Sequence, residues 1–168
     1  MTRGAAALAL AAAVCGCRGE ARPEAKPEGS AAAAAVQNEG KVEIVPGPNE
    51  GSVKAAVQAE VTRARTRHRQ LVVYVGAHWC EPCMRFHQAA AAGKLDARYP
   101  RLTLLEFDLD RDRERLAEAG YVSRMIPLFM LPNADGSASG EHIEGSIKGD
   151  AAVDEIAPRL DALLAKAR

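Results

Sequence analysis

The sequence has few cysteines and no excess of charge of either sign. Only four of its 168 residues are cysteine, in two close pairs, Cys15 with Cys17 and Cys80 with Cys83, which is too few for a scaffold held together by disulfides. Lysine plus arginine and aspartate plus glutamate both total 22, so no net field favours nucleic acid, an anionic membrane surface or an acidic partner. We therefore expect a single core whose partners are chosen by a local site.

The N-terminal segment predicts export. Arg3 precedes an uninterrupted apolar run over residues 5–14, which has the length of a signal-peptide hydrophobic region and falls well short of the ~20 residues that span a bilayer. The Val-Cys-Gly-Cys sequence at residues 14–17 resembles the lipobox of bacterial lipoproteins, in which a small residue precedes an acylated cysteine. We predict a signal peptide with a lipobox over residues 1–17 and lipidation of Cys17.

Alternatives to lipidation of Cys17 stay open. Cys15 is a second candidate, although the bulky Val14 before it suits a lipobox less well. An ordinary cleaved signal peptide, or a misplaced start codon, would leave both cysteines without a role. A lipidated and an ordinary signal peptide share one consequence, which is export to an oxidising compartment, here the bacterial cell envelope or periplasm.

Residues 18–40 predict a disordered linker. They are rich in alanine, proline, glutamate, glycine and serine, and their only large apolar residue is Val36, so they cannot bury enough surface to offset the entropy of ordering. A tether of this length would let a globular head sample space around a membrane attachment point. The sequence therefore predicts one folded domain over residues 41–168.

Predicted strands and helices alternate along this domain. Apolar runs rich in β-branched residues indicate buried strands at 71–75 and 102–107, and shorter strands are expected at 42–45, 128–131 and 141–144. Helical spacing predicts helices after Ser52, from the second cysteine pair to Gly93, at 111–119 and at about 150–165. The basic run at 63–69 predicts a solvated helix end, with a docking patch for an acidic partner as the alternative. Strands separated by helices indicate an α/β sandwich with a central sheet.

The second cysteine pair has the spacing of a redox-active disulfide at the start of a helix. Unpaired helix N–H groups and the positive end of the helix dipole stabilise a thiolate at Cys80, while Cys83 lies one turn further in. We predict that Cys80 attacks and Cys83 resolves the mixed disulfide. Pro82 suits the first helical turn, where its missing N–H costs nothing.

A metal half-site and an incidental pair are the alternatives for an isolated C-x-x-C motif. A structural zinc needs four ligands, and the sequence contains no second C-x-x-C and no H-x-x-x-H motif. His78 and His87 are close enough in sequence to leave copper or zinc binding open as the lesser alternative. We predict no bound metal and no cofactor beyond the cysteine pair itself.

The residues around the pair resemble the thioredoxin superfamily. Residues 71–83, LVVYVGAHWCEPC, are similar to the strand and active-site turn of that family, with Glu81 in place of glycine in its W-C-G-P-C core. Residues 121–127, YVSRMIP, are similar to the segment that enters its cis-proline, and Gly145 stands where the family has a glycine in its last strand. The resemblance covers residues 71–168 and implies a thioredoxin-like three-layer α/β/α sandwich with a central mixed β-sheet.

The resemblance also implies a substrate-binding surface. It implies that the Ile126-Pro127 peptide bond is cis and faces the disulfide, with the Ile126 backbone free to bond an extended substrate strand. It makes Trp79 a recognition platform beside the sulfur. The alternatives are that Pro127 merely begins an edge strand and that Trp79 is a packed core aromatic.

Two departures from the family bear on proton transfer and redox potential. Thioredoxins commonly bury an aspartate where Tyr74 stands, and the lysine that partners it aligns here with Asp108, so the proton of the resolving cysteine must be handled differently, through Glu81, Tyr74, Asp108, Glu106 or water. Glu81 adds negative charge beside Cys80, which should raise the pKa of that thiol and favour the disulfide form of the protein. We therefore expect a reducing couple tuned by Glu81 and Pro82.

The sequence predicts a thiol-disulfide oxidoreductase that works in the reducing direction on cysteine-containing envelope proteins. A membrane or soluble thiol donor would recharge it, and a lipid would tether it to the membrane. The alternative is a non-catalytic thioredoxin-fold binding module, either chaperone-like or a copper- or metal-handling lipoprotein, because a fold does not determine a function.

Overall fold

A computed structural model describes residues 40–167. The predicted signal peptide, both N-terminal cysteines and the predicted linker up to residue 39 lie outside this part of the chain. The elements in chain order are β1 (Glu43–Pro46), α2 (Val53–Thr66), β2 (Gln70–Gly76), α3 (Glu81–Ala91), β3 (Leu102–Asp108), α4 (Leu109–Glu118), β4 (Leu128–Pro132), β5 (Ala138–Glu144) and α5 (Ala152–Leu164).

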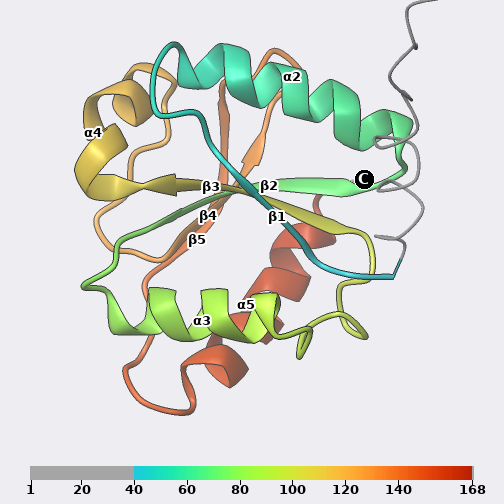
Figure 1. Ribbon diagram of the computed structural model, residues 1–168, viewed down its shortest axis with the longest axis vertical. Coiled ribbons are helices and arrows are strands. Elements are labelled where there is room, and N and C mark those ends of the chain that lie inside the picture. The colour runs from blue at the N-terminus through green and yellow to red at the C-terminus, as the bar shows by residue number, and fades with distance from the viewer. Residues whose placement is uncertain (1–39, 168) are drawn as a thin grey trace, which may run out of the picture.

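Five strands form one mixed sheet in the order β1-β3-β2-β4-β5. The first three strands of this order run parallel to one another, and β4 and β5 are antiparallel to their neighbours. Helices α2 and α4 pack on one face of the sheet, and α3 and α5 pack on the other (Figure 1). The predicted thioredoxin-like α/β/α sandwich with a central mixed sheet is confirmed.

Strand β2 is buried on both faces. Val72 and Tyr74 belong to the core beneath α3 and α5, whereas Leu71, Val73 and Val75 belong to the core beneath α2 and α4. This alternation follows from the two-residue period of a strand. It explains why the run is continuously apolar in the sequence, because a strand between two helical layers has no solvent-facing side.

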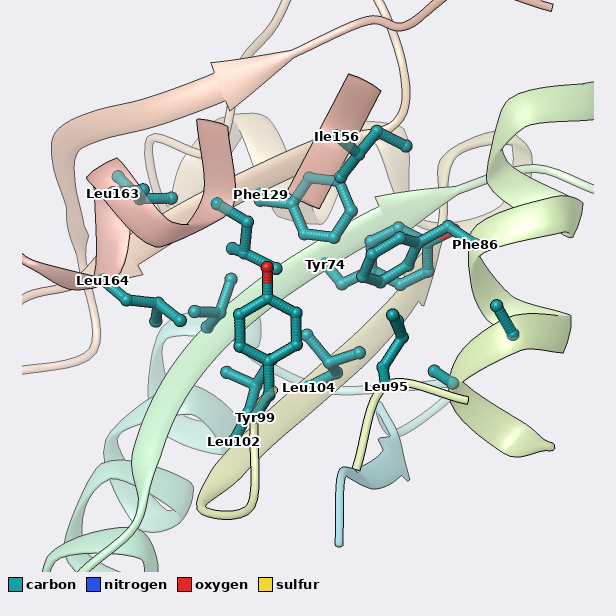
Figure 2. Packing of buried hydrophobic residues seen from close by; sticks show 14 of the residues in the cluster. Tyr74, Phe86, Leu95, Tyr99, Leu102, Leu104, Phe129, Ile156, Leu163 and Leu164 are labelled. Carbon is teal, nitrogen blue, oxygen red and sulfur yellow. The ribbon is translucent and has the colours of Figure 1, made fainter. Parts of the chain in front are cut away.

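Three of the seven aromatic residues meet in the core beneath α3 and α5. The ring centroids of Tyr74 and Phe129 are 5.0 Å apart, and those of Phe86 and Phe129 are 4.7 Å apart in an edge-to-face arrangement. Figure 2 shows these rings between the sheet and the two helices. Offset and edge-to-face aromatic pairs contribute ~0.5–1.5 kcal/mol beyond their buried area, so this cluster fixes α3 on β2.

The basic run at 63–69 does not form a uniformly solvated helix end, because Arg69 is buried. Its guanidinium donates 2.8 Å to the Thr103 hydroxyl and 2.7 Å to the Lys41 carbonyl, and it lies 3.3 Å from a Glu43 carboxylate oxygen. Arg69 thus joins the start of β3 to β1. A buried cation persists when its donors are satisfied in this way.

Strand β5 is longer than expected from the sequence. It begins at Ala138, three residues before its expected start, because Ala138 pairs with Pro132 of β4.

The helices of the domain are not of the membrane-spanning kind. Within residues 40–167, no helix has the length and apolar character needed to cross a membrane.

A buried carboxylate holds the start of α4. Asp112 is fully buried, pairs with Arg111 at 2.7 Å and also pairs with Arg115. It accepts the Asp108 N–H at 3.2 Å, while Arg115 donates 2.9 Å to the Pro48 carbonyl, so one network links α4 to the loop after β1. Burial alone would raise the pKa of Asp112, but hydrogen bonds from the two arginines outweigh it, so the pKa lies below its usual value.

We predict that Asp112→Asn lowers the free energy of unfolding at pH 7 by about 3 kcal/mol, because it removes one partner of a buried charge network. The carboxylate stabilises the fold above the unfolded-state pKa of about 3.9, and this stabilisation is lost as pH falls through the lower native-state pKa. Urea unfolding between pH 7 and pH 3 measures both effects. The exposed Asp154→Asn is the matched control and should change stability by less than about 0.5 kcal/mol.

Candidate active site

The cysteine pair lies where β2 passes into α3. Cys80 is the N-cap of α3, its sulfur accepts the Cys83 N–H at 3.4 Å, and the two sulfurs form a disulfide of 2.10 Å. Pro82 occupies the first turn, as expected from its missing N–H. Cys80 is 5% exposed and Cys83 2% exposed. Both cysteines are thus buried, and a thiolate at Cys80 would lie against the helix N–H groups.

Tyr74 anchors the first turn of α3. Its hydroxyl donates 2.9 Å to the Cys83 carbonyl, and burial raises its pKa well above the usual value, with the negative charge of Glu106 as a second cause. The residue across from Tyr74 on β3 is Glu106, whereas Asp108 pairs with Gly76. Asp108 therefore does not take the place of the family's lysine; its carboxylate instead caps α4.

Glu81 is turned toward Arg85 and the loop before α5. Its carboxylate accepts 2.8 Å from the Arg85 guanidinium and 3.2 Å from the Gly149 N–H. The hydrogen bond from Arg85 is the main reason why the pKa of Glu81 is lowered. Arg85 also pairs with Asp150. The negative charge that the sequence puts beside Cys80 is thus partly balanced by Arg85.

Trp79 projects into solvent immediately before the disulfide. It is 59% exposed, and its indole N–H donates 2.7 Å to the Asp110 carboxylate of α4. This exposure is not that of a packed core aromatic. The hydrogen bond to Asp110 holds one edge of the indole ring, and the rest of the ring is exposed and available for contact with a partner.

The Ile126-Pro127 peptide bond is cis, as the resemblance implies. Ile126 packs against the small cluster that contains Cys80 and Cys83, so this loop lies beside the disulfide. Gly145, directly after β5, has a φ of +67°, and a Cβ there would approach Met125 side-chain atoms at 3.1–3.2 Å. The glycine predicted from the family thus permits the close approach of the loop to the end of β5.

Three loops meet at the disulfide end of the sheet. Val75 near the end of β2 pairs with Leu128 at the start of β4, and Leu128 pairs with Glu144 at the end of β5. The segments after β2, before β4 and after β5 therefore lie at one edge. Four of the five large exposed apolar side chains among residues 40–167 belong to these segments, namely Trp79, Val122, Met125 and Ile147, and the fifth, Met84, lies in α3 directly after Cys83.

A cleft of about 370 Å³ adjoins Cys83 at the carboxyl ends of the parallel strands. His87, one turn after Cys83 on α3, and Glu106 of β3 both line it, and His87 Nδ1 lies 2.8 Å from Glu106 Oε1. The sequence suggested His87 only as a metal ligand. Its spacing of four residues from Cys83 was the available signal, but the pairing with Glu106 needs the sheet.

Metal binding gains no support from the part of the chain that the structure describes. No group of three or more histidine, cysteine, aspartate or glutamate side chains is arranged there to hold an ion. His78 is exposed, and His87 is engaged with Glu106.

Among solved structures, the chain is similar to thioredoxins. The long form of thioredoxin f from spinach chloroplast shares 22% identity at a TM-score of 0.49, covering 81% of this chain and 94% of that one. Trichomonas vaginalis thioredoxin shares 20% identity at 0.48, covering 74% and 97%, and a poplar thioredoxin h shares 22% at 0.47, covering 74% and 96%. No family model and no curated protein matches the sequence. The site assignments rest on this chain's own geometry.

We predict that Glu81→Gln shifts the titration of the Cys80 thiol to lower pH, because it removes a nearby negative charge and leaves Arg85 with Asp150 as its remaining carboxylate partner. The shift should be below about one pH unit, since exposed charges are screened by solvent and salt. Thiolate absorbance against pH in a Cys83→Ser background measures it. The double variant Glu81→Gln/Arg85→Gln should titrate close to the parent. A shift to higher pH in the single variant would mean that the carboxylate supports the thiolate.

Proposed function

We propose that this chain is a thiol-disulfide oxidoreductase that reduces disulfides in cysteine-containing proteins of the cell envelope. The observation that carries the proposal is the Cys80–Cys83 disulfide at the N-cap of α3 in a thioredoxin-like fold. A disulfide that closes across one helical turn can open and re-form without rearranging the sheet below it. A purely structural bridge between residues three apart would add little constraint to the fold, because the loop it closes is so short.

The reaction proceeds by two exchanges. The Cys80 thiolate attacks one sulfur of the target disulfide, and the target's other sulfur leaves as a thiolate. The Cys83 sulfur then attacks Cys80, which releases the second target sulfur and re-forms the Cys80–Cys83 disulfide. The target disulfide is reduced to two thiols, and a membrane or soluble dithiol donor must return the two electrons to the enzyme.

The apolar edge around the disulfide supports a polypeptide substrate. Trp79 is exposed beside Cys80, and Ile126 of the cis-proline loop packs against the cysteine pair. An extended chain lying between them would present its cysteine to Cys80 and bury apolar side chains on Trp79 and Met125. Large apolar patches on a protein surface commonly mark such binding sites.

The reducing direction is supported by charge. The Glu81 carboxylate follows Cys80 directly and opposes a thiolate there, which favours the disulfide form of the protein and makes the dithiol a better electron donor. Arg85 balances part of this effect. We therefore place the couple on the reducing side of the superfamily range, which runs from about −270 mV to about −120 mV.

The proposed location is the bacterial envelope. The apolar run of residues 5–14 and the lipobox-like residues 14–17 support export and acylation at Cys17, and the linker over residues 18–40 would hold the redox domain away from the membrane. Cysteine pairs in exported proteins would be the targets, because disulfides persist in that compartment.

We predict that the wild-type protein reduces insulin disulfides with a dithiol donor and that Cys83→Ser traps mixed disulfides through Cys80. Removing the resolving thiol leaves the first exchange intact and blocks the second. Non-reducing electrophoresis with mass spectrometry of the trapped peptide measures this. The proposed assignment predicts no trapping by Cys80→Ser.

Trapping only by Cys80→Ser would reverse the two cysteine roles. A wild-type protein that binds envelope proteins without turning over any disulfide would favour the non-catalytic binding module. Metal analysis of the same purified protein distinguishes that module from a copper- or zinc-handling protein.

We also predict that Cys17→Ala moves the protein from the membrane fraction to the soluble fraction, because it removes the acylated residue. Fractionation and mass spectrometry of the N-terminus measure this. Cys15→Ala is the matched control and should leave the protein in the membrane fraction. An unmodified N-terminus together with unchanged fractionation of Cys17→Ala would rule out the anchor.

A further inference from the structure

We propose that His87, held by Glu106, takes the proton from the Cys83 thiol when Cys83 resolves the mixed disulfide. The inference rests on the proposed function, because it assigns a residue to one step of that reaction. It answers the question raised by Tyr74, which stands where the resembled family has a buried aspartate.

The other side chains suggested for this role are engaged elsewhere. The Tyr74 hydroxyl donates to the Cys83 carbonyl at 2.9 Å, and burial raises its pKa so far that it keeps its proton at neutral pH. The Glu81 carboxylate is paired with Arg85. One carboxylate oxygen of Asp108 accepts two backbone N–H groups at the start of α4. Tyr74 thus has no basic oxygen to offer, Glu81 is paired with Arg85, and Asp108 is held at the start of α4.

The cleft beside Cys83 provides the path for a proton from the Cys83 thiol to His87. Its volume of about 370 Å³ is room for several water molecules, each of which takes about 30 Å³ in the liquid, and the carboxylates of Glu106 and Asp108 in its lining can bond them. His87 follows Cys83 by four residues, so the two side chains lie on the same face of α3. The ionisable side chains that face the cleft, besides the cysteine, are Tyr74 of β2, His78 before α3, His87 of α3, Glu106 and Asp108 of β3, and Arg111 of α4.

The pairing with Glu106 prepares His87 for this role. The distance of 2.8 Å between His87 Nδ1 and Glu106 Oε1 is a hydrogen bond, in which a neutral imidazole donates its Nδ1–H. This arrangement leaves Nε2 as the basic nitrogen, and the carboxylate stabilises the imidazolium that forms when Nε2 accepts a proton. The His87 side chain is 41% exposed and that of Glu106 29%, so the acquired proton can pass on to solvent.

In this step a proton moves to His87 and an electron pair moves to the target sulfur. In the mixed disulfide, Cys80 is bonded to the target sulfur and Cys83 is a thiol. Water in the cleft relays the Cys83 proton to Nε2 of His87, and the Cys83 sulfur forms its bond to Cys80 as the bond from Cys80 to the target breaks. The electron pair leaves with the target thiolate, so the target is reduced and the cysteine pair is oxidised. His87 then returns its proton to solvent.

A pH-jump experiment isolates this step. The full chain carries Cys15→Ser and Cys17→Ser in every variant, so that only the active-site pair reacts. The reduced protein is treated with 5,5′-dithiobis(2-nitrobenzoate) at low pH to form the aryl mixed disulfide on Cys80, and a jump to higher pH lets Cys83 release the coloured aryl thiolate. This leaving group needs no proton, so the first-order rate reports deprotonation of Cys83.

We expect His87→Gln to slow the release at neutral pH by about tenfold or more, as for loss of a general base. The pH profile should change as well. The wild-type rate should level off with rising pH, because the neutral imidazole is the base, whereas the variant rate should keep rising with pH. Glu106→Gln should slow the release less, and added imidazole should restore the rate of His87→Ala.

Two control variants separate this role from general effects on the cleft. His78→Gln removes the other imidazole at the cleft, and Gln88→Ala changes a lining residue that does not titrate; both should keep the wild-type rate and pH profile. A wild-type rate and profile in His87→Gln, or the same loss in His78→Gln, would overturn the inference. Reduction of insulin by the wild-type protein tests the proposed function independently, because turnover does not depend on which group takes the proton.

Discussion

Burial of β2 on both faces is the constraint on which the rest of the structure depends. Alternate side chains of the strand pack beneath the two helical layers. A shift of the strand by one residue would therefore move every side chain into the opposite core. Because the strand is fixed, the turn that follows it is fixed as well. The cysteine pair is therefore presented at a defined point, with Cys80 at the N-cap of a helix that the aromatic cluster holds against the same strand.

The aromatic cluster also explains how this chain departs from the thioredoxin pattern. A buried carboxylate behind the disulfide would have to be desolvated, which is costly for a charge without a partner. Tyr74 fills that position with a ring packed on Phe86 and Phe129 and satisfies its hydroxyl on the Cys83 carbonyl. An uncharged, packed ring therefore lies behind the disulfide. The ionisable groups near Cys83 lie instead in the open cleft, where Glu106 and His87 keep contact with solvent.

Two different features adjoin the disulfide. The antiparallel pairing of β4 with β2 and β5 brings the loops before β4 and after β5, which carry exposed apolar side chains, to the end of the sheet where the cysteine pair lies. The carboxyl ends of the parallel strands form a cleft beside the second cysteine, with His87 and Glu106 in its lining. The mixed sheet produces both features, because parallel and antiparallel neighbours of β2 deliver different loops to the same end.

The sequence by itself determined the features that depend on residues close together in the chain. The two-residue period of the strands, the Ser52 cap and the C-x-x-C motif at a helix start were all predictable, and so was the sandwich that they build. The family resemblance added the cis peptide bond at Pro127.

Only the tertiary structure decided which distant residues meet. The register between β2 and β3 puts Glu106, and not Asp108, across from Tyr74, and it brings Glu106 to His87. The burial of Arg69 against Thr103 depends on a partner 34 residues away. Local propensity carries no information on such pairs, because register and long-range pairing are set by the packing of whole elements and not by neighbours in the chain.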